Sequence, residues 1–137
     1  MWKRIESQQD LDDLSNLVNW EDSFVLEMIG SSQTPSYFPN DINNSGHPEL
    51  NYFFLIDPAH SKDFDYLEVA FIHCEFRDTE VFKNFILSGK VTPLKKVEIV
   101  NKNGESKLVC NGVLFREIKG ELWPWKESYF KQADSLS

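Results

Sequence analysis

Two short groups of side chains have residue types and spacing that could support chemistry, and the first surrounds His60. Asp57, His60, Asp63 and Asp65 lie within nine residues and offer oxygen and imidazole ligands. Divalent cations take such ligands, so a metal site is one interpretation. The spacing lacks the central glycine and the closing glutamate of an EF-hand loop. A solvated turn, in which the aspartates bond to nearby backbone groups, is therefore the favoured interpretation.

The second group is His73 with Glu75, two positions apart in a segment that alternates like a strand. Residues two apart share one face of a strand, which suits a general acid/base pair. Cys74 faces the other way, so a catalytic Cys-His pair is disfavoured in a regular strand. A surface row of His73, Glu75 and Arg77 is the simpler interpretation. A small metal-dependent or acid/base enzyme built on either group is the alternative function.

Signatures of well-known catalytic classes are missing from the sequence. It contains no Gly-x-Ser-x-Gly elbow, no glycine-rich phosphate loop after a strand, no Cys-x-x-Cys and no His-Glu-x-x-His. The two cysteines, Cys74 and Cys110, lie in separate apolar segments and are expected to be buried thiols in a reducing compartment. We therefore expect a non-enzymatic protein with no catalytic residue, no bound metal and no cofactor.

The charge of the chain is distributed unevenly. Between Arg4 and Lys62 there is no lysine or arginine, but there are ten carboxylates. From Lys62 onward the chain has 12 basic and 12 acidic residues, so the net charge of -8 arises from the first part. A surface of one sign attracts basic proteins and repels nucleic acid and anionic membranes. A basic protein partner is expected, and neither nucleic acid nor membrane is.

Part of this acidic stretch forms a candidate partner-binding site around Trp20. Its members are Asp10, Asp12, Asp13, Trp20, Glu21 and Asp22. In the functional interpretation the carboxylates dock a basic protein, and Trp20 with Tyr37 or Phe38 supplies apolar anchors. In the structural interpretation the acids interact favourably with a helix dipole or are simply solvated.

Length and composition bound the architecture that must position these residues. A chain of 137 residues with 41% apolar and 14% aromatic residues fits a single domain over residues 1–137. The basic N-terminus has no apolar run behind it, which argues against an ordinary signal peptide. The longest apolar run, Tyr52 to Ile56, is far shorter than the roughly 20 residues that cross a bilayer. A cytoplasmic protein is expected.

In the first half, the pattern predicts a helix, two strands and a long loop. A helix capped by Ser7 runs to about Val18, with leucines recurring at helical spacing. The alternation of Phe24, Leu26 and Met28 predicts a first strand that ends at Gly30. Residues 31–49 are rich in Pro, Ser and Asn and are expected to form a loop. Residues 50–56 are apolar on both faces, which predicts a central strand.

In the second half, a change of parity near Phe71 to His73 predicts a β-bulge. A short helix over residues 80–88, ending at Gly89, is favoured over an edge strand there. Residues 94–100 and 106–110 form a hairpin across Asn103-Gly104. The second Asn-Gly, at residues 111–112, is either another turn or a bulge within one long strand. The aromatic C-terminal segment is expected to pack on the sheet, with the last few residues frayed.

The separation of helix and strand signals predicts an α+β fold. An N-terminal helix would pack on a mostly antiparallel, bulged β-sheet, with the short second helix and the packed aromatic C-terminal segment as additions.

The N-terminal features follow a particular order over roughly residues 2 to 29. A tryptophan near the start precedes a capped acidic helix, and Trp20-Glu21-Asp22-Ser23 then leads into a strand. This order resembles small bacterial immunity-type domains, in which a helix is followed by a His-Asp-Ser element and a meandering sheet, and the likeness extends loosely over Leu67 to Phe71. Glu21 stands where the family has histidine, so no imidazole role carries over. The resemblance implies a structural role for Asp22 and Ser23 at the corner between helix and strand.

The resemblance also implies a function, which is the neutralisation of a toxin encoded by a neighbouring gene. Together with the charge distribution, it makes a non-enzymatic acidic immunity protein that binds a basic toxin the leading hypothesis. A third hypothesis is a structural subunit of a larger assembly, docked on another chain through its aromatic C-terminal segment.

Overall fold

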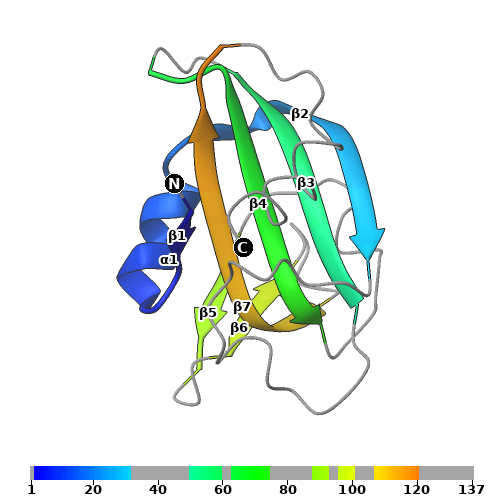
Figure 1. Cartoon of the computed structure of the whole chain (residues 1–137). Coiled ribbons are helices and arrows are strands. Elements are labelled where there is room, and N and C mark those ends of the chain that lie inside the picture. The colour runs from blue at the N-terminus through cyan, green and yellow to red at the C-terminus, as the bar shows by residue number, and fades with distance from the viewer. Residues whose placement is uncertain are drawn as a thin grey trace.

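The computed structural model describes residues 2–31, 50–59, 63–74, 88–92, 96–100 and 107–120, which form one sheet with one helix beside it (Figure 1). The elements are β1 (Lys3–Arg4), α1 (Gln8–Ser15), β2 (Asn19–Ser31), β3 (Leu50–Ala59), β4 (Tyr66–Cys74), β5 (Ser88–Val91), β6 (Val97–Val100) and β7 (Lys107–Ile118). The strand order is β2-β3-β4-β7-β6-β5, and β1 pairs with β7 outside this path. Every strand pair described is antiparallel.

The prediction of an α+β fold is wrong, because the chain is mostly β and its sheet curls into a half-barrel. Side chains of β6 share one core cluster with side chains of β3, although β4 and β7 lie between them in the sheet. The curled sheet therefore supplies both walls of its own core. The only helix in the described ranges has eight residues and adds two fully buried leucines, Leu11 and Leu14.

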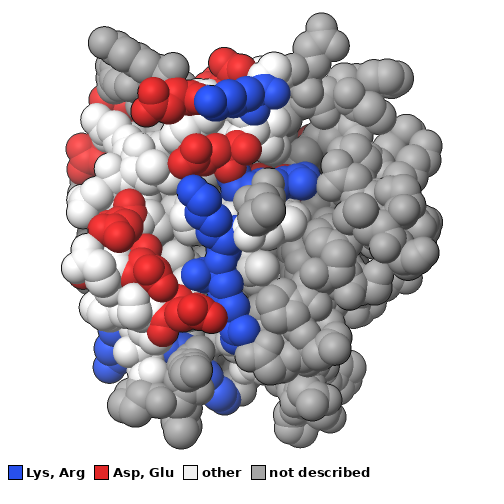
Figure 2. Space-filling model, turned by 60° about the vertical axis from the view of Figure 1, so that its left-hand side comes forward, with Lys and Arg blue, Asp and Glu red and all other residues white. Residues whose placement is uncertain are grey.

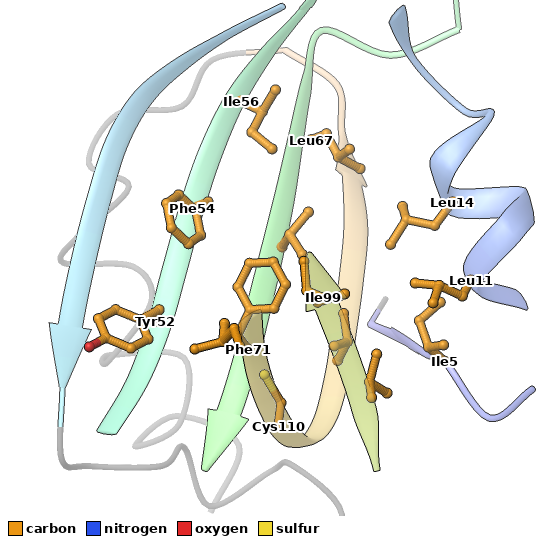
Figure 3. Close-up of a cluster of buried hydrophobic side chains, with 14 of the residues drawn as sticks. Ile5, Leu11, Leu14, Tyr52, Phe54, Ile56, Leu67, Phe71, Ile99 and Cys110 are labelled. Carbon is orange, nitrogen blue, oxygen red and sulfur yellow. The ribbon is translucent and has the colours of Figure 1, made fainter. Parts of the chain in front are cut away.

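The inner core combines side chains of the concave face of the sheet with Leu11 and Leu14 of α1 (Figure 3). Phe54 and Phe71 meet edge to face, with ring centroids 5.4 Å apart and planes at 80°. A smaller cluster of Phe53, Ala70, Ile72 and Leu114 lies on the other face of the sheet, and these residues are buried as well. Burial on both faces explains the continuous apolar runs of β3 and β4. The prediction of a central strand at residues 50–56 is confirmed, since β3 lies between β2 and β4.

The predicted bulge is present in β4. Tyr52 pairs with Phe71 and Leu50 with Cys74, so Asn51 alone opposes two residues of β4, one of them His73. His73 has a φ of 50°, which is unusual for a residue with a side chain. Its backbone N–H donates to the side-chain oxygen of Asn51 over 2.8 Å, within the protein interior. The bulge thus replaces a ladder hydrogen bond with a bond to a buried side chain.

Strand β7 changes parity at the same level of the sheet. Cys110 and Val113 both belong to the inner core although they are three residues apart. The register with β4 is nevertheless unbroken, with Gly112 opposite Ile72. The second Asn-Gly therefore lies within one long strand, and its interpretation as a turn is wrong. Irregularities at one level of two neighbouring strands bend the sheet there, which carries β6 and β5 around the core.

The predicted hairpin is confirmed in its strands, because Val97 pairs with Cys110 and Val100 with Lys107. Its Asn-Gly turn lies outside the described residues, as do most of the predicted 80–88 helix, nearly all of the 31–49 loop and the aromatic C-terminal segment. Gly89 was expected to stop that helix, but it is part of β5. A Cβ atom at Gly89 would overlap the backbone carbonyl of Glu98 on β6, so glycine is needed for the close approach of these strands.

Helix α1 begins as predicted and ends earlier. The Ser7 hydroxyl accepts a hydrogen bond from the Asp10 backbone N–H over 3.1 Å. The Gln8 side chain ties the first turn to β5, donating to the Gly89 carbonyl over 3.1 Å and accepting from the Val91 backbone N–H over 2.9 Å. At the other end, the indole N–H of Trp20 donates to the carbonyl of Ser15 over 2.8 Å. This bond satisfies a carbonyl of the last turn, where the helix ends.

Candidate functional site

The three acidic residues of α1 have different roles. Asp10 is half-buried, and its carboxylate accepts a hydrogen bond from the Glu6 backbone N–H over 3.0 Å, so it helps to form the N-terminal cap. Asp12 and Asp13 are exposed, and each accepts a hydrogen bond from a neutral glutamine amide one turn earlier, over 3.0 and 2.7 Å. These bonds orient the two carboxylates without neutralising their charge.

The structure places Trp20 in the core. Its side chain is 6% exposed and its indole N–H bonds to the helix, so it does not offer an apolar anchor at the surface. Glu21 and Asp22, which follow it, are exposed. The sequence showed an aromatic residue among acids, but it did not show that the indole N–H would find its acceptor inside the fold.

Asp22 and Ser23 form local hydrogen bonds with Asn19 at the start of β2. The Asp22 carboxylate accepts a hydrogen bond from the side-chain amide of Asn19 over 3.1 Å. The Ser23 hydroxyl donates to the backbone carbonyl of Asn19 over 2.6 Å. Both residues therefore stabilise the start of β2, while the carboxylate of Asp22 stays at the surface.

The acidic surface of α1 adjoins basic side chains. Figure 2 shows acidic side chains along one side of this face and a column of basic side chains next to them. Lys3 and Arg4, the only basic residues before Lys62, line a pocket of about 310 Å³ together with Asp10, Asp13 and Glu117. The expectation of an acidic face without cations is therefore wrong at this place. The α1 part of the predicted site has mixed charge.

The most exposed apolar side chains of the described structure lie on β2. Their exposed fractions are 70% for Phe24, 44% for Val25, 49% for Leu26 and 49% for Met28. We refer to these four residues as the β2 apolar strip. Sequence reasoning missed this surface, because consecutive apolar residues in a strand are also what a strand buried on both faces would contain.

The β2 apolar strip continues directly from Glu21 and Asp22. Val25 pairs with Ile56 and Glu27 with Leu55, so Leu26 is an extra residue in β2 and forms a bulge. Bulges increase the local twist of a strand and turn side chains away from the regular pleat. This irregularity accounts for three successive exposed apolar residues where a regular strand would bury alternate ones.

The candidate catalytic and metal-binding groups are not brought together in the part that the structure describes. Asp57 and Asp63 are exposed, and Asp65 accepts a hydrogen bond from the backbone N–H of Gly120 over 2.6 Å. His60 and Glu75 lie outside the described residues. Within the described ranges, no three His, Cys, Asp or Glu side chains lie close enough together to hold a metal ion. His73 is buried at the β4 bulge.

Pairing of β4 with β7 creates two contacts that local sequence patterns do not reveal. The thiols of Cys74 and Cys110 are fully buried, as expected, and their sulfur atoms lie 3.5 Å apart. Glu68 and Arg116 are opposite each other, with 2.6 Å between Glu68 Oε1 and Arg116 Nε. The Arg116 guanidinium also lies 4.6 Å from the ring centroid of Trp2. Each partner is far from the other in sequence, so only the fold brings them together.

Comparison with protein families, with curated proteins and with solved structures finds no match for this chain. The resemblance to immunity-type domains therefore stays a prediction. No helix within the described ranges has the length and apolar character needed to cross a bilayer.

Proposed function

We propose that the protein is a non-enzymatic interaction protein that binds a basic protein partner through the surface of β2, including its acidic residues Glu21 and Asp22. The observation that carries this proposal is the β2 apolar strip next to exposed Glu21 and Asp22. Large exposed apolar patches bordered by polar residues are typical of protein–protein interaction sites. The four strip residues replace Trp20 as the apolar anchors of the site.

Charge supports the choice of a basic partner. Strands β2 and β3 contain Glu21, Asp22, Glu27 and Asp57 and no lysine or arginine. The mixed charges near Lys3 make the α1 surface less selective than the surface of β2. Complementary charge speeds the encounter of two proteins and disfavours wrong partners, while apolar anchors supply most of the affinity. This division of roles fits an acidic strand with an exposed apolar centre.

An immunity protein that neutralises a basic toxin in the cytoplasm is the specific form of this proposal. It is supported by the order of helix, Asp22 and Ser23 at the strand entrance, and by the net charge of -8. A toxin must be blocked quickly in the cell that makes it, and electrostatic attraction raises association rates most at low ionic strength.

The test is the affinity for the protein encoded beside this one, measured at low and high salt. We expect binding that weakens with salt and that falls at least about tenfold when Glu21→Gln and Asp22→Asn are combined. Asp12→Asn combined with Asp13→Asn is the matched control, because it removes the same number of exposed carboxylates from α1. Binding that is insensitive to salt, or that is lost only through changes in residues 90–120, would contradict the proposal.

A further inference from the structure

We infer that the partner docks by strand addition, with an extended basic segment pairing along the edge of β2 that no described strand occupies. The inference rests on the proposed function and specifies its geometry. The segment would place lysine or arginine opposite Glu21, Asp22 and Glu27 and apolar residues against the β2 apolar strip. In this mode, backbone hydrogen bonds provide affinity and the side chains provide specificity.

The position of β2 in the sheet supports this mode. The strand order ends at β2, and among the described strands its partner is β3 on one side. Figure 1 shows β2 along the outer border of the sheet. With 13 residues it is the longest strand described, although natural proteins usually keep edge strands short or protect them with lysine or proline. Neither of these residue types occurs in β2.

The apolar strip lies in the middle of this edge. Phe24 and Val25 are successive residues in regular register with Asp57 and Ile56 of β3, and successive side chains of a regular strand point to opposite faces, so apolar surface is exposed on both sides of the edge. A segment added beside β2 would cover such a surface on both faces at once. A partner that packed against one face of the sheet would leave part of the strip exposed.

Charge selects the occupant of the edge. In a second copy of this chain, the same strand would bring three more carboxylates to the interface, and like charges opposite each other destabilise a strand pair. Opposite charges in cross-strand positions stabilise it. A basic segment of a different protein therefore fits this edge better than a second copy does.

The probe for this mode is a labelled synthetic peptide of about ten residues in which lysine and valine alternate, long enough to pair with an average strand. Its binding to the full chain is measured by fluorescence anisotropy. Two control peptides separate charge from strand pairing. One carries proline at alternate valine positions and keeps the charge but cannot form the ladder. The other has glutamate in place of lysine.

We expect saturable binding of the lysine-valine peptide and at least tenfold weaker binding of both controls. Phe24→Lys combined with Leu26→Lys should also weaken binding at least tenfold, since lysine protects an edge. Serine at the same two positions should weaken it without adding charge. Asp12→Asn combined with Asp13→Asn, on α1, should leave peptide binding unchanged. Circular dichroism shows whether each variant keeps the strand signal of the parent.

Three results would overturn strand addition. They are equal binding of the proline and valine peptides, no saturable binding of any peptide, and a dimer in sedimentation that Leu26→Lys dissociates. The proposed function fails separately, when the protein encoded by the neighbouring gene does not bind at all. If that protein binds, and binding is weakened by Glu21→Gln with Asp22→Asn but not by Phe24→Lys with Leu26→Lys, the function stands and the strand-addition mode is wrong.

Discussion

Replacing Arg116 with alanine is expected to destabilise the fold strongly, because Glu68 would remain as a charged group inside the sheet. The side chain of Glu68 is 0% exposed and that of Arg116 is 14% exposed. The two residues oppose each other on β4 and β7, with 2.6 Å between Glu68 Oε1 and Arg116 Nε. The Arg116→Ala change removes both this ion pair and the stacking of the guanidinium on Trp2.

The size of the effect follows from burial. Removing one partner of a buried ion pair costs about 3–5 kcal/mol, mostly because the other charge is left without compensation. Since Arg116 retains some contact with water, we expect a loss of about 3 kcal/mol in the free energy of unfolding. That is a large share of the free energy of unfolding of a typical domain, which is roughly 5–15 kcal/mol. It corresponds to a fall of roughly 10 °C in melting temperature.

A double-mutant cycle isolates the contribution of the pair. Glu68→Gln removes the buried charge, so Arg116→Ala should cost about 2 kcal/mol less in that background than in the parent. Unfolding in urea, followed by tryptophan fluorescence and circular dichroism, gives the free energies by linear extrapolation. Lys90→Ala is the matched control, because Lys90 forms an ion pair with Glu98 over 3.3 Å while its side chain is 71% exposed. The Glu98 side chain is 12% exposed, but water reaches the Lys90 end of this pair, and pairs open to solvent contribute about 0–1 kcal/mol.

The reasoning would be refuted if Arg116→Ala cost no more than Lys90→Ala. It would also be refuted if Glu68→Gln left the cost of Arg116→Ala unchanged, since the two effects would then be independent.

Two further substitutions and one labelling experiment test other parts of the fold. Asn51→Ala removes the acceptor of the buried His73 N–H and should cost about 1–3 kcal/mol in urea unfolding; a cost below about 0.5 kcal/mol would contradict the bulge geometry. Gly89→Ala should cost about 1–3 kcal/mol through its clash with β6, and unchanged stability would show that the strands are not in close contact. Cys74 and Cys110 should resist a thiol reagent until denaturant is added, and rapid labelling of the native protein would contradict their burial.

Features encoded by neighbouring residues could be predicted from the sequence. The parity change between Phe71 and Cys74 indicates the bulge, because an inserted residue shifts the residues that follow it by one position and so changes which of them face the inner core. The cap at Ser7 is likewise local, since its acceptor and its donor are three residues apart. The pairing of β6 with β7 follows from two apolar runs joined by Asn-Gly.

Features that depend on distant pairing could not be predicted. The contacts of Glu68 with Arg116 and of Cys74 with Cys110 join residues 48 and 36 positions apart, and they exist only because β4 lies beside β7. The curl of the sheet also depends on matched irregularities in these two strands. Without knowledge of the curl, the helical stripe of α1 suggested a helical layer, which led to the wrong α+β prediction.

The candidate site shows the same limit. Edge or central position is a property of the whole sheet, so the exposure of Phe24 could not be read from β2 alone. Trp20 among acids has the composition of a surface anchor, but its position five residues after Ser15 lets the indole turn inward to the helix. The acidic character of Glu21 and Asp22 was apparent from the sequence, whereas the apolar surface beside them required the fold.

Amide hydrogen exchange of the full chain, with and without the lysine-valine peptide, tests the central claim most directly. Strand addition forms new backbone hydrogen bonds along β2, so exchange over residues 21–28 should slow when the peptide is present, while exchange in α1 should stay the same. Protection confined to α1, or no protection anywhere in the chain, would contradict the claim that β2 receives a basic partner.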